Sequence, residues 1–198
     1  MPSAMAPPPL RAFLWISMSL LLWTPTAAGD APEAPSHADP RVADAMRLIE
    51  SEDPYQRQLG FLRLEALREP GTAELIRPYV DSRDPELRAY TVRALAAIEG
   101  AAAVPALLKA LDEDPNPRVR RAALLGLEPL QPQNPQILPA CIAALRDRKP
   151  EVRMTAVDVV SRVDDPRARE AILVRNKRER DRNVQRALSL AMKRLGGS

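Results

Sequence analysis

The sequence contains one cysteine and one histidine, and this scarcity limits the chemistry available to the chain. A single cysteine, Cys141, cannot form a disulfide within the chain, so an exported form must be stable without one. The histidine, His37, has no second histidine or cysteine near it, which disfavours a metal site or a catalytic base. No glycine-rich phosphate loop or serine, histidine and acid set is present either. The sequence therefore predicts no metal, no cofactor and no enzymatic site.

Long apolar runs are also missing, apart from one near the start. Residues 12–23 (AFLWISMSLLLW) are apolar except for two serines, and small residues follow them. Twelve residues at ~1.5 Å each reach only ~18 Å, which is too short for a hydrocarbon layer of ~30 Å. The run is typical of a secretory signal peptide, cut after Ala28, and indicates a periplasmic or secreted protein. A cytosolic protein with an unusual N-terminus remains the alternative.

Three segments follow from this division of the chain. Residues 1–28 are the predicted signal peptide, and residues 29–39 form a linker in which prolines alternate with charges and nothing large enough to pack occurs. Residues 40–198 are expected to form the folded domain.

The folded domain contains one string five times. The strings begin at Asp53, Asp84, Asn116, Lys149 and Asp181, at intervals of 31, 32, 33 and 32 residues. Each combines a short polar start with apolar residues at helical spacing, as in "DPELRAYTVRAL". An Asp or Asn side chain can accept hydrogen bonds from the first free amides of a helix, and a proline directly after it loses no needed donor. A period of this length indicates stacked helical pairs, because one pair cannot bury its own apolar face.

Shorter apolar runs between these strings supply the first helix of each pair. The predicted fold is all-α, an α-solenoid with a right-handed superhelix, built of five hairpins at about 40–68, 71–99, 101–130, 134–163 and 166–195. On the first helix of the fourth pair, Cys141 lies among apolar residues at helical spacing. It is therefore expected to be a small buried core residue.

The string "AAVPALLKALDEDPNPRVRRAALLGL" resembles the short HEAT-like repeats of the phycobilin-lyase type, and the resemblance extends over about 155 residues. It implies that turn aspartates and second-helix arginines form a polar ladder between neighbouring repeats. The first repeat keeps the arginine but has Ser51 at the ladder position, and the last has Gln185 in place of the arginine. The expected ladder residues are Arg57, Arg88, Asp114, Arg120, Asp147 and Arg153, with the pairs Asp114–Arg120, Asp147–Arg153 and, one residue longer, Asp81–Arg88.

Charge is distributed unevenly along the chain. Residues 29–145 carry 13 basic and 18 acidic residues, whereas residues 146–198 carry 15 basic and 8 acidic ones. The densest basic segment, "RNKRERDR" at 175–182, is either a solvated turn or a docking patch for an acidic protein, an anionic lipid or a polyanion. Nucleic acid is disfavoured because this basic part contains no aromatic residue for base stacking. The 26 carboxylates could supply an acid–base pair, but nearly all fall on expected turns and exposed helix faces.

A protein-binding scaffold is the predicted function, because solenoids of this kind present their second helices side by side on a concave surface. The alternatives are an electrostatic binder of membrane surface or polyanion through the basic C-terminal third, and a lyase-like enzyme or enzyme accessory subunit. In the third string, Arg118 and Arg121 fall opposite the core stripe of Val119, Ala123 and Leu127. A row of arginines with an exposed tyrosine at one end could grip an acidic partner segment. The predicted partner-binding residues are Tyr90, Arg93, Arg118, Arg121, Arg162, Arg186 and Arg194.

Overall fold

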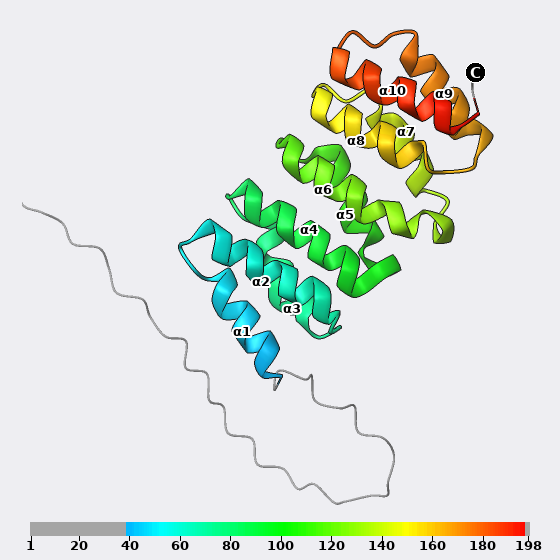
Figure 1. Ribbon diagram of the computed structural model, residues 1–198. Coiled ribbons are helices and arrows are strands. Elements are labelled where there is room, and N and C mark those ends of the chain that lie inside the picture. Colours follow the sequence, from blue (N-terminus) through cyan, green and yellow to red (C-terminus); the bar gives the residue numbers. More distant parts are fainter. Residues whose placement is uncertain (1–38, 197–198) are drawn as a thin grey trace, which may run out of the picture. The chain divides into compact units, whose positions relative to one another are not determined.

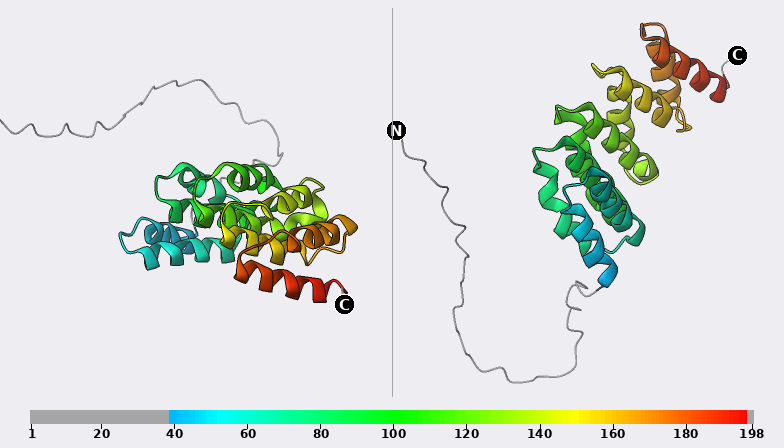
Figure 2. Two further views of the ribbon diagram at one scale, coloured as in Figure 1. Left: turned by 90° about the horizontal axis from the view of Figure 1, so that it is seen from above. Right: turned by 60° about the vertical axis from the view of Figure 1, so that its left-hand side comes forward.

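The computed structural model describes residues 39–196, and this part of the chain is all helix and turn without a strand. Five helical pairs follow one another in chain order, from α1 and α2 at one end to α9 and α10 at the other (Figures 1 and 2). The predicted solenoid of five hairpins is confirmed, with each pair inside the expected boundaries to within a few residues. The predicted signal peptide and linker residues 29–38 lie outside the described residues.

Each pair consists of a first and a second helix, and three 3₁₀ turns extend or precede these helices. The first helices are α1 (Pro40–Ile49), α3 (Thr72–Ile76, continued by the 3₁₀ turn Arg77–Asp81), α5 (Val104–Glu113, after the 3₁₀ turn Gly100–Ala103), α7 (Ile137–Ala144, after the 3₁₀ turn Glu128–Gln133) and α9 (Pro166–Asn176). The second helices are α2 (Pro54–Leu67), α4 (Pro85–Glu99), α6 (Pro117–Leu127), α8 (Pro150–Val160) and α10 (Arg182–Arg194). Neighbouring second helices pack directly against one another (Figure 1).

The second helices begin where the repeated strings predict. Asp53, Asp84, Asn116 and Asp181 each accept a hydrogen bond from the amide two residues later, at 2.8–2.9 Å. Lys149 cannot accept such a bond, and its own amide donates instead to a carboxylate oxygen of Asp147 at 2.8 Å. The same side-chain cap therefore starts four of the five second helices, and a proline directly follows three of these caps.

The core runs along the array between the two helix layers. Its largest fully buried side chains include Leu64, Leu95, Leu107, Leu124 and Leu127, which come from the first three pairs. The two helices of the first pair lie close together at Gly60, where an added Cβ would lie 2.7 Å from the carbonyl oxygen of Ala45. Burial of this kind across every pair provides the hydrophobic stabilisation of the array.

One stretch, Pro85–Glu113, is long and apolar enough by composition to cross a membrane. It is not one straight helix, because α4 ends before Gly100, which has a φ of +56°, and α5 begins at Val104. Half of its apolar window is buried inside the domain. The apolar character of this stretch therefore follows from its place in the core of the second and third pairs.

Candidate partner-binding surface

A polar ladder joins the turns of neighbouring repeats, and its first half lies within each repeat. One side chain in the first turn of each second helix reaches back to the backbone carbonyl oxygen six residues earlier, at 2.8–3.1 Å. Each such bond satisfies a carbonyl at the turn between the paired helices. The donor and acceptor pairs are Arg57 with Ser51, Arg88 with Ser82, Arg120 with Asp114, Arg153 with Asp147, and Gln185 with Glu179.

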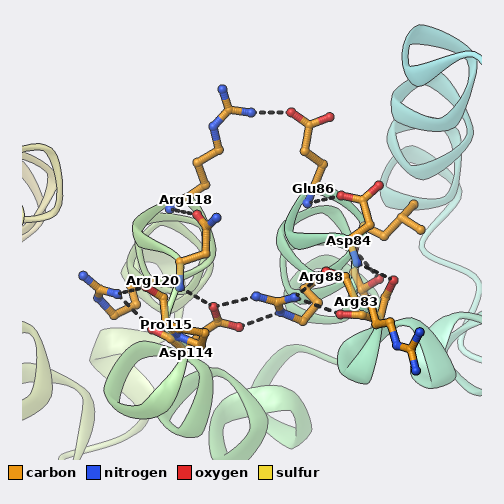
Figure 3. Close-up of polar contacts among 12 residues, drawn as sticks. Arg83, Asp84, Glu86, Arg88, Asp114, Pro115, Arg118 and Arg120 are labelled. Carbon is orange, nitrogen blue, oxygen red and sulfur yellow. Dashed lines mark hydrogen bonds and ion pairs between the residues drawn. The ribbon is translucent and has the colours of Figure 1, made fainter.

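The second half of the ladder crosses from one repeat to the next (Figure 3). Arg88 donates two hydrogen bonds to the carboxylate of Asp114, at 2.8 and 2.9 Å. Arg120 donates two to Asp147, at 2.7 and 2.8 Å. Bidentate pairs of this kind fix both the distance and the orientation of the two groups. The ladder therefore sets the register of the central repeats relative to each other.

The carboxylate pairing expected from the sequence is wrong in its register. Asp114 and Asp147 were expected to pair with the arginines of their own repeats, but they pair with Arg88 and Arg120 of the preceding repeats. The arginines of the same repeats, Arg120 and Arg153, donate only to the backbone carbonyls of these two aspartates. In the second repeat, Arg88 donates to the carbonyl of Ser82 and not to Asp81.

Glu179 is a ladder residue that the sequence analysis missed. It accepts two hydrogen bonds of 2.9 Å from Arg153, and its side chain is 1% exposed. It stands two residues before the helix-capping Asp181, which is the place that Asp114 and Asp147 occupy before their own caps. Counting from the cap would have found it. In the second repeat this place is taken by a serine, Ser82, and Arg57 of the first repeat lies 3.6 Å from the carboxylate of Asp84.

The charged ladder groups have shifted pKa values. Burial alone would raise the pKa of Glu179, but hydrogen bonds from Arg153, Arg175 and two backbone amides lower it to about 2. The pKa of Asp147 is lowered in the same manner, since hydrogen bonds from Arg120 and a backbone amide outweigh its burial. Both carboxylates are thus ionised at neutral pH and belong to the scaffold of the fold.

The outward surface of the second helices is built from three positions of each repeated string: the second, fifth and ninth residues after the cap. We call this surface the second-helix ridge, and none of its members is buried. It consists of Tyr55, Gln58 and Leu62 on α2; Glu86, Ala89 and Arg93 on α4; Arg118, Arg121 and Leu125 on α6; Glu151, Met154 and Asp158 on α8; and Asn183, Arg186 and Leu190 on α10.

Four of the seven predicted binding residues come together between α4 and α6. Tyr90, Arg93, Arg118 and Arg121 line a shallow hollow of about 180 Å³ between α4 and α6, with Leu125 beside them. The other three lie further along the array. Arg162 and Arg194 meet at Asp158, at 2.7 and 3.5 Å, and Arg186 makes no side-chain hydrogen bond or ion pair with the described residues.

Most of these arginines are bound to a neighbouring repeat and do not form a free row. Arg118 pairs with Glu86 across α4 and α6 (Figure 3). Other links of this kind are Arg93 with Glu65 at 3.0 Å, Arg121 with Thr155 at 3.1 Å, and Arg162 with Glu128 at 2.6 Å. The charged positions of the ridge therefore act first as braces between repeats.

The expectation that Tyr90 is exposed is wrong. Its side chain is half-buried, and its ring centroid lies 5.7 Å from that of Phe61 in the preceding repeat. Burial is the main reason why the pKa of Tyr90 is raised. The edge of the ring still borders the hollow between α4 and α6.

Exposed apolar side chains mark the ridge more clearly than its arginines do. Among residues 39–196, eight large apolar side chains are exposed, and five of them are ridge residues. An apolar surface that recurs over several repeats is typical of a protein-binding face. The five are Tyr55 and Leu62 on α2, Leu125 on α6, Met154 on α8 and Leu190 on α10.

Polar residues occupy several positions of the end repeats that inner repeats bury against a neighbour, so the exposure of the ridge residues is not a consequence of missing neighbours. The exposed Leu59 is not a ridge residue: it holds the sixth position after the cap, which in later repeats faces the preceding repeat, as the contacts of Tyr90 with Phe61 and of Thr155 with Arg121 show. The third and tenth positions after the cap face the preceding repeat, as the contact of Gly126 with Ala96 shows. Inner repeats bury an apolar residue or glycine at the tenth position. The first repeat has Gln56 at the third position and Arg63 at the tenth, and both are exposed. The eighth position faces the following repeat; the last repeat has the exposed Ser189 there, and the other four bury Phe61, Val92, Leu124 and Val157.

Both acidic residues of the basic segment 175–182 have structural roles. Glu179 is buried in the ladder, and Asp181 caps α10. Arg175 pairs with Glu179, while Lys177 and Arg178 are exposed. The exposed side chains of the segment therefore carry a larger excess of basic over acidic groups than the segment does as a whole.

The part of the chain that the structure describes contains no metal-binding cluster. No three histidine, cysteine, aspartate or glutamate side chains of residues 39–196 are placed to hold a metal ion. Cys141 is fully buried, and burial raises the pKa of its thiol to about 12. A thiol of this kind is a core group, since the reactive form is the thiolate.

Comparison with known proteins agrees with this geometry. The family of HEAT repeats matches residues 45–128 and 104–193. Among solved structures, the chain resembles the complex of CpcE and CpcF of phycocyanin lyase from Nostoc sp. PCC7120, with a TM-score of 0.63 and 23% sequence identity over 77% of this chain and 98% of that chain. At this identity the likeness establishes a shared fold. No curated protein sequence matches the chain.

Proposed function

Because the chain belongs to the HEAT repeat family, we propose that it is a non-catalytic scaffold that binds a protein partner along the second-helix ridge. The observation that carries the proposal is the exposure of large apolar side chains on the ridge, at positions that do not face a neighbouring repeat. Leu62, Leu125 and Leu190 occupy the same ninth position in the first, third and fifth repeats, and are 41%, 43% and 59% exposed. Such a row offers one apolar contact at every second repeat.

The charged ridge residues give this apolar row a polar surround. Arg93 and Asp158 hold the ninth position in the two intervening repeats, and each is engaged with a charged group of an adjacent repeat. Paired charges at the border of an apolar surface give a contact its specificity and orientation. The hollow beside Leu125 is the natural place for an anchoring side chain of the partner.

The ridge can be tested by replacing Leu62, Leu125 and Leu190 together with serine. Partners would be crosslinked to the chain in its native compartment, identified, and then titrated against purified variants. The triple variant should keep its helical content and weaken binding at least ~tenfold, about 1.4 kcal/mol. Leu173→Ser is the matched control, because Leu173 is 46% exposed but lies on the first helix α9. Equal binding by the triple variant and the control would overturn the proposal.

A charge exchange separates the binding role of Arg118 from its bracing role. Arg118→Glu alone places a second carboxylate beside that of Glu86, whereas Arg118→Glu combined with Glu86→Arg restores an ion pair. If Arg118 contacts the partner, the double variant should be as stable as the wild type and still bind more weakly. Full recovery of binding in the double variant would assign Arg118 to the fold alone.

A second candidate is a lyase-like enzyme or an enzyme accessory subunit, which the likeness to a phycocyanin lyase complex supports. A chromophore that copurifies with the chain, or turnover of one, would favour it over a scaffold. We also propose that the protein is exported to the periplasm or secreted, on the basis of the short apolar run at 12–23. Mass determination of the mature N-terminus tests this, and retention of residues 1–28 on exported protein would refute it.

A further inference from the structure

We propose that the groove between the first helices α7 and α9 is a second binding site, which takes an acidic segment of a protein partner with an apolar side chain in it. The groove has a volume of about 430 Å³. Its floor is apolar and includes Ile142 and Leu145 from the α7 side and Val174 from α9. Val174 is 38% exposed, whereas Ile172, two residues earlier on the same helix, is fully buried.

Four arginines stand around this apolar floor. Arg167 is held by Asp165 at 2.7 Å, and Arg175 is held by Glu179 at 2.5 Å. Arg146 and Arg178 have no hydrogen bond or ion pair from their side chains to any of residues 39–196. Two guanidinium groups therefore remain available on the rim.

Only one carboxylate, that of Glu170, lines the groove. The nearest other acid of the basic segment, Glu179, is buried beneath Arg153 and Arg175 and adds no acceptor to the surface. The rim is thus positively charged over an apolar floor. Carboxylates can be bound by guanidinium groups through two parallel hydrogen bonds, which makes an acidic peptide the matching occupant.

A protein segment fits this groove better than a membrane or a nucleic acid does. The apolar floor lies between two helices, where a side chain of a peptide can enter and a flat lipid surface cannot reach. Tyr90 is the last aromatic residue of the chain, so the groove has no ring on which a base could stack. The site also lies on the first-helix layer, apart from the second-helix ridge, and the two can be occupied at the same time.

The test uses a short fluorescein-labelled peptide of glutamates with two central leucines, titrated against the purified chain by fluorescence anisotropy. Arg146→Glu with Arg178→Glu should weaken binding at least ~tenfold. Lys177→Glu with Arg180→Glu is the matched control, because it makes the same change in net charge at exposed positions that do not line the groove. The control should lose less than about threefold. Replacing the two leucines of the peptide by serine should also weaken binding.

Three results would overturn the proposal: no binding of the peptide by the wild type, equal losses in the two charge-reversed variants, or displacement of the peptide by phosphatidylglycerol vesicles at least as readily as by unlabelled peptide. Val174→Trp provides a second variant that fills the groove without changing its charge, and it should abolish peptide binding while the helical content stays unchanged. Retained peptide binding by this variant would equally refute the groove. Serine substitution of the ridge leucines should leave peptide binding unaffected, so failure of the groove and failure of the ridge are distinguishable.

Discussion

Replacement of Glu179 by glutamine should remove a large part of the acid sensitivity of the last two repeats. Glu179 accepts hydrogen bonds from Arg153, from Arg175 and from the amides of Arg180 and Asp181. Its burial opposes ionisation, but these donors lower its pKa from 4.5 to about 2. A folded-state pKa below that of the unfolded chain means that the contribution to stability is complete above about pH 5 and is lost as the pH falls towards 2.

The size of the effect follows from the shift. A difference of about 2.5 pKa units corresponds to roughly 3 kcal/mol, of which about 2 kcal/mol should be lost by pH 3. Urea unfolding at pH 7 and pH 3 should therefore show a larger loss of unfolding free energy for the wild type than for Glu179→Gln. Glu170→Gln is the control, because Glu170 is exposed and lies on the same helix as Arg175. An identical pH dependence for Glu179→Gln and the wild type would refute the ladder as the source of acid sensitivity.

Three further predictions concern the core. Leu124→Ala should lower the unfolding free energy by ~2–5 kcal/mol in urea titration, and Leu195→Ala by less, because Leu124 is fully buried in the central pair and Leu195 is only partly buried at the end; equal losses would argue against an array. Gly60→Ala should destabilise by about 1–3 kcal/mol, because its Cβ would meet the carbonyl oxygen of Ala45 and force α1 away from α2; an unchanged melting temperature would contradict this close packing. Cys141 should react with a thiol reagent only in denaturant, and rapid labelling of the native chain would contradict its burial.

The helical pairs could be predicted because their signals are local. Asp84 and Asn116 cap α4 and α6 through bonds to amides two residues away, and a proline follows each cap. Such starts depend on a few consecutive residues and recur at a nearly constant interval, so a single sequence contains both the element and its period. The same reasoning failed for Glu179, which lies in a segment whose charge density obscured its place before the cap.

Contacts between repeats could not be predicted in the same way, because they depend on how one pair stacks on the next. Arg120 lies six residues after Asp114 and 27 residues before Asp147, and only stacking brings it to the second carboxylate. Sequence spacing favoured the near partner. Likewise, the outward position of Arg118 follows from helical periodicity, but its pairing with Glu86 requires α4 and α6 to lie side by side.

This difference explains why the arginines gave an incomplete view of the surface. A side chain as long as arginine can cross to the adjacent second helix, so its outward position does not make it available to a partner. Leucine cannot satisfy a charge on a neighbouring repeat, and exposure of Leu62, Leu125 and Leu190 brings no benefit to the isolated array. Since the ends of the same array carry Gln56 and Ser189 where inner repeats are mostly buried and apolar, polar residues are found where the fold requires them. The apolar residues left on the ridge are therefore the better guide to the partner.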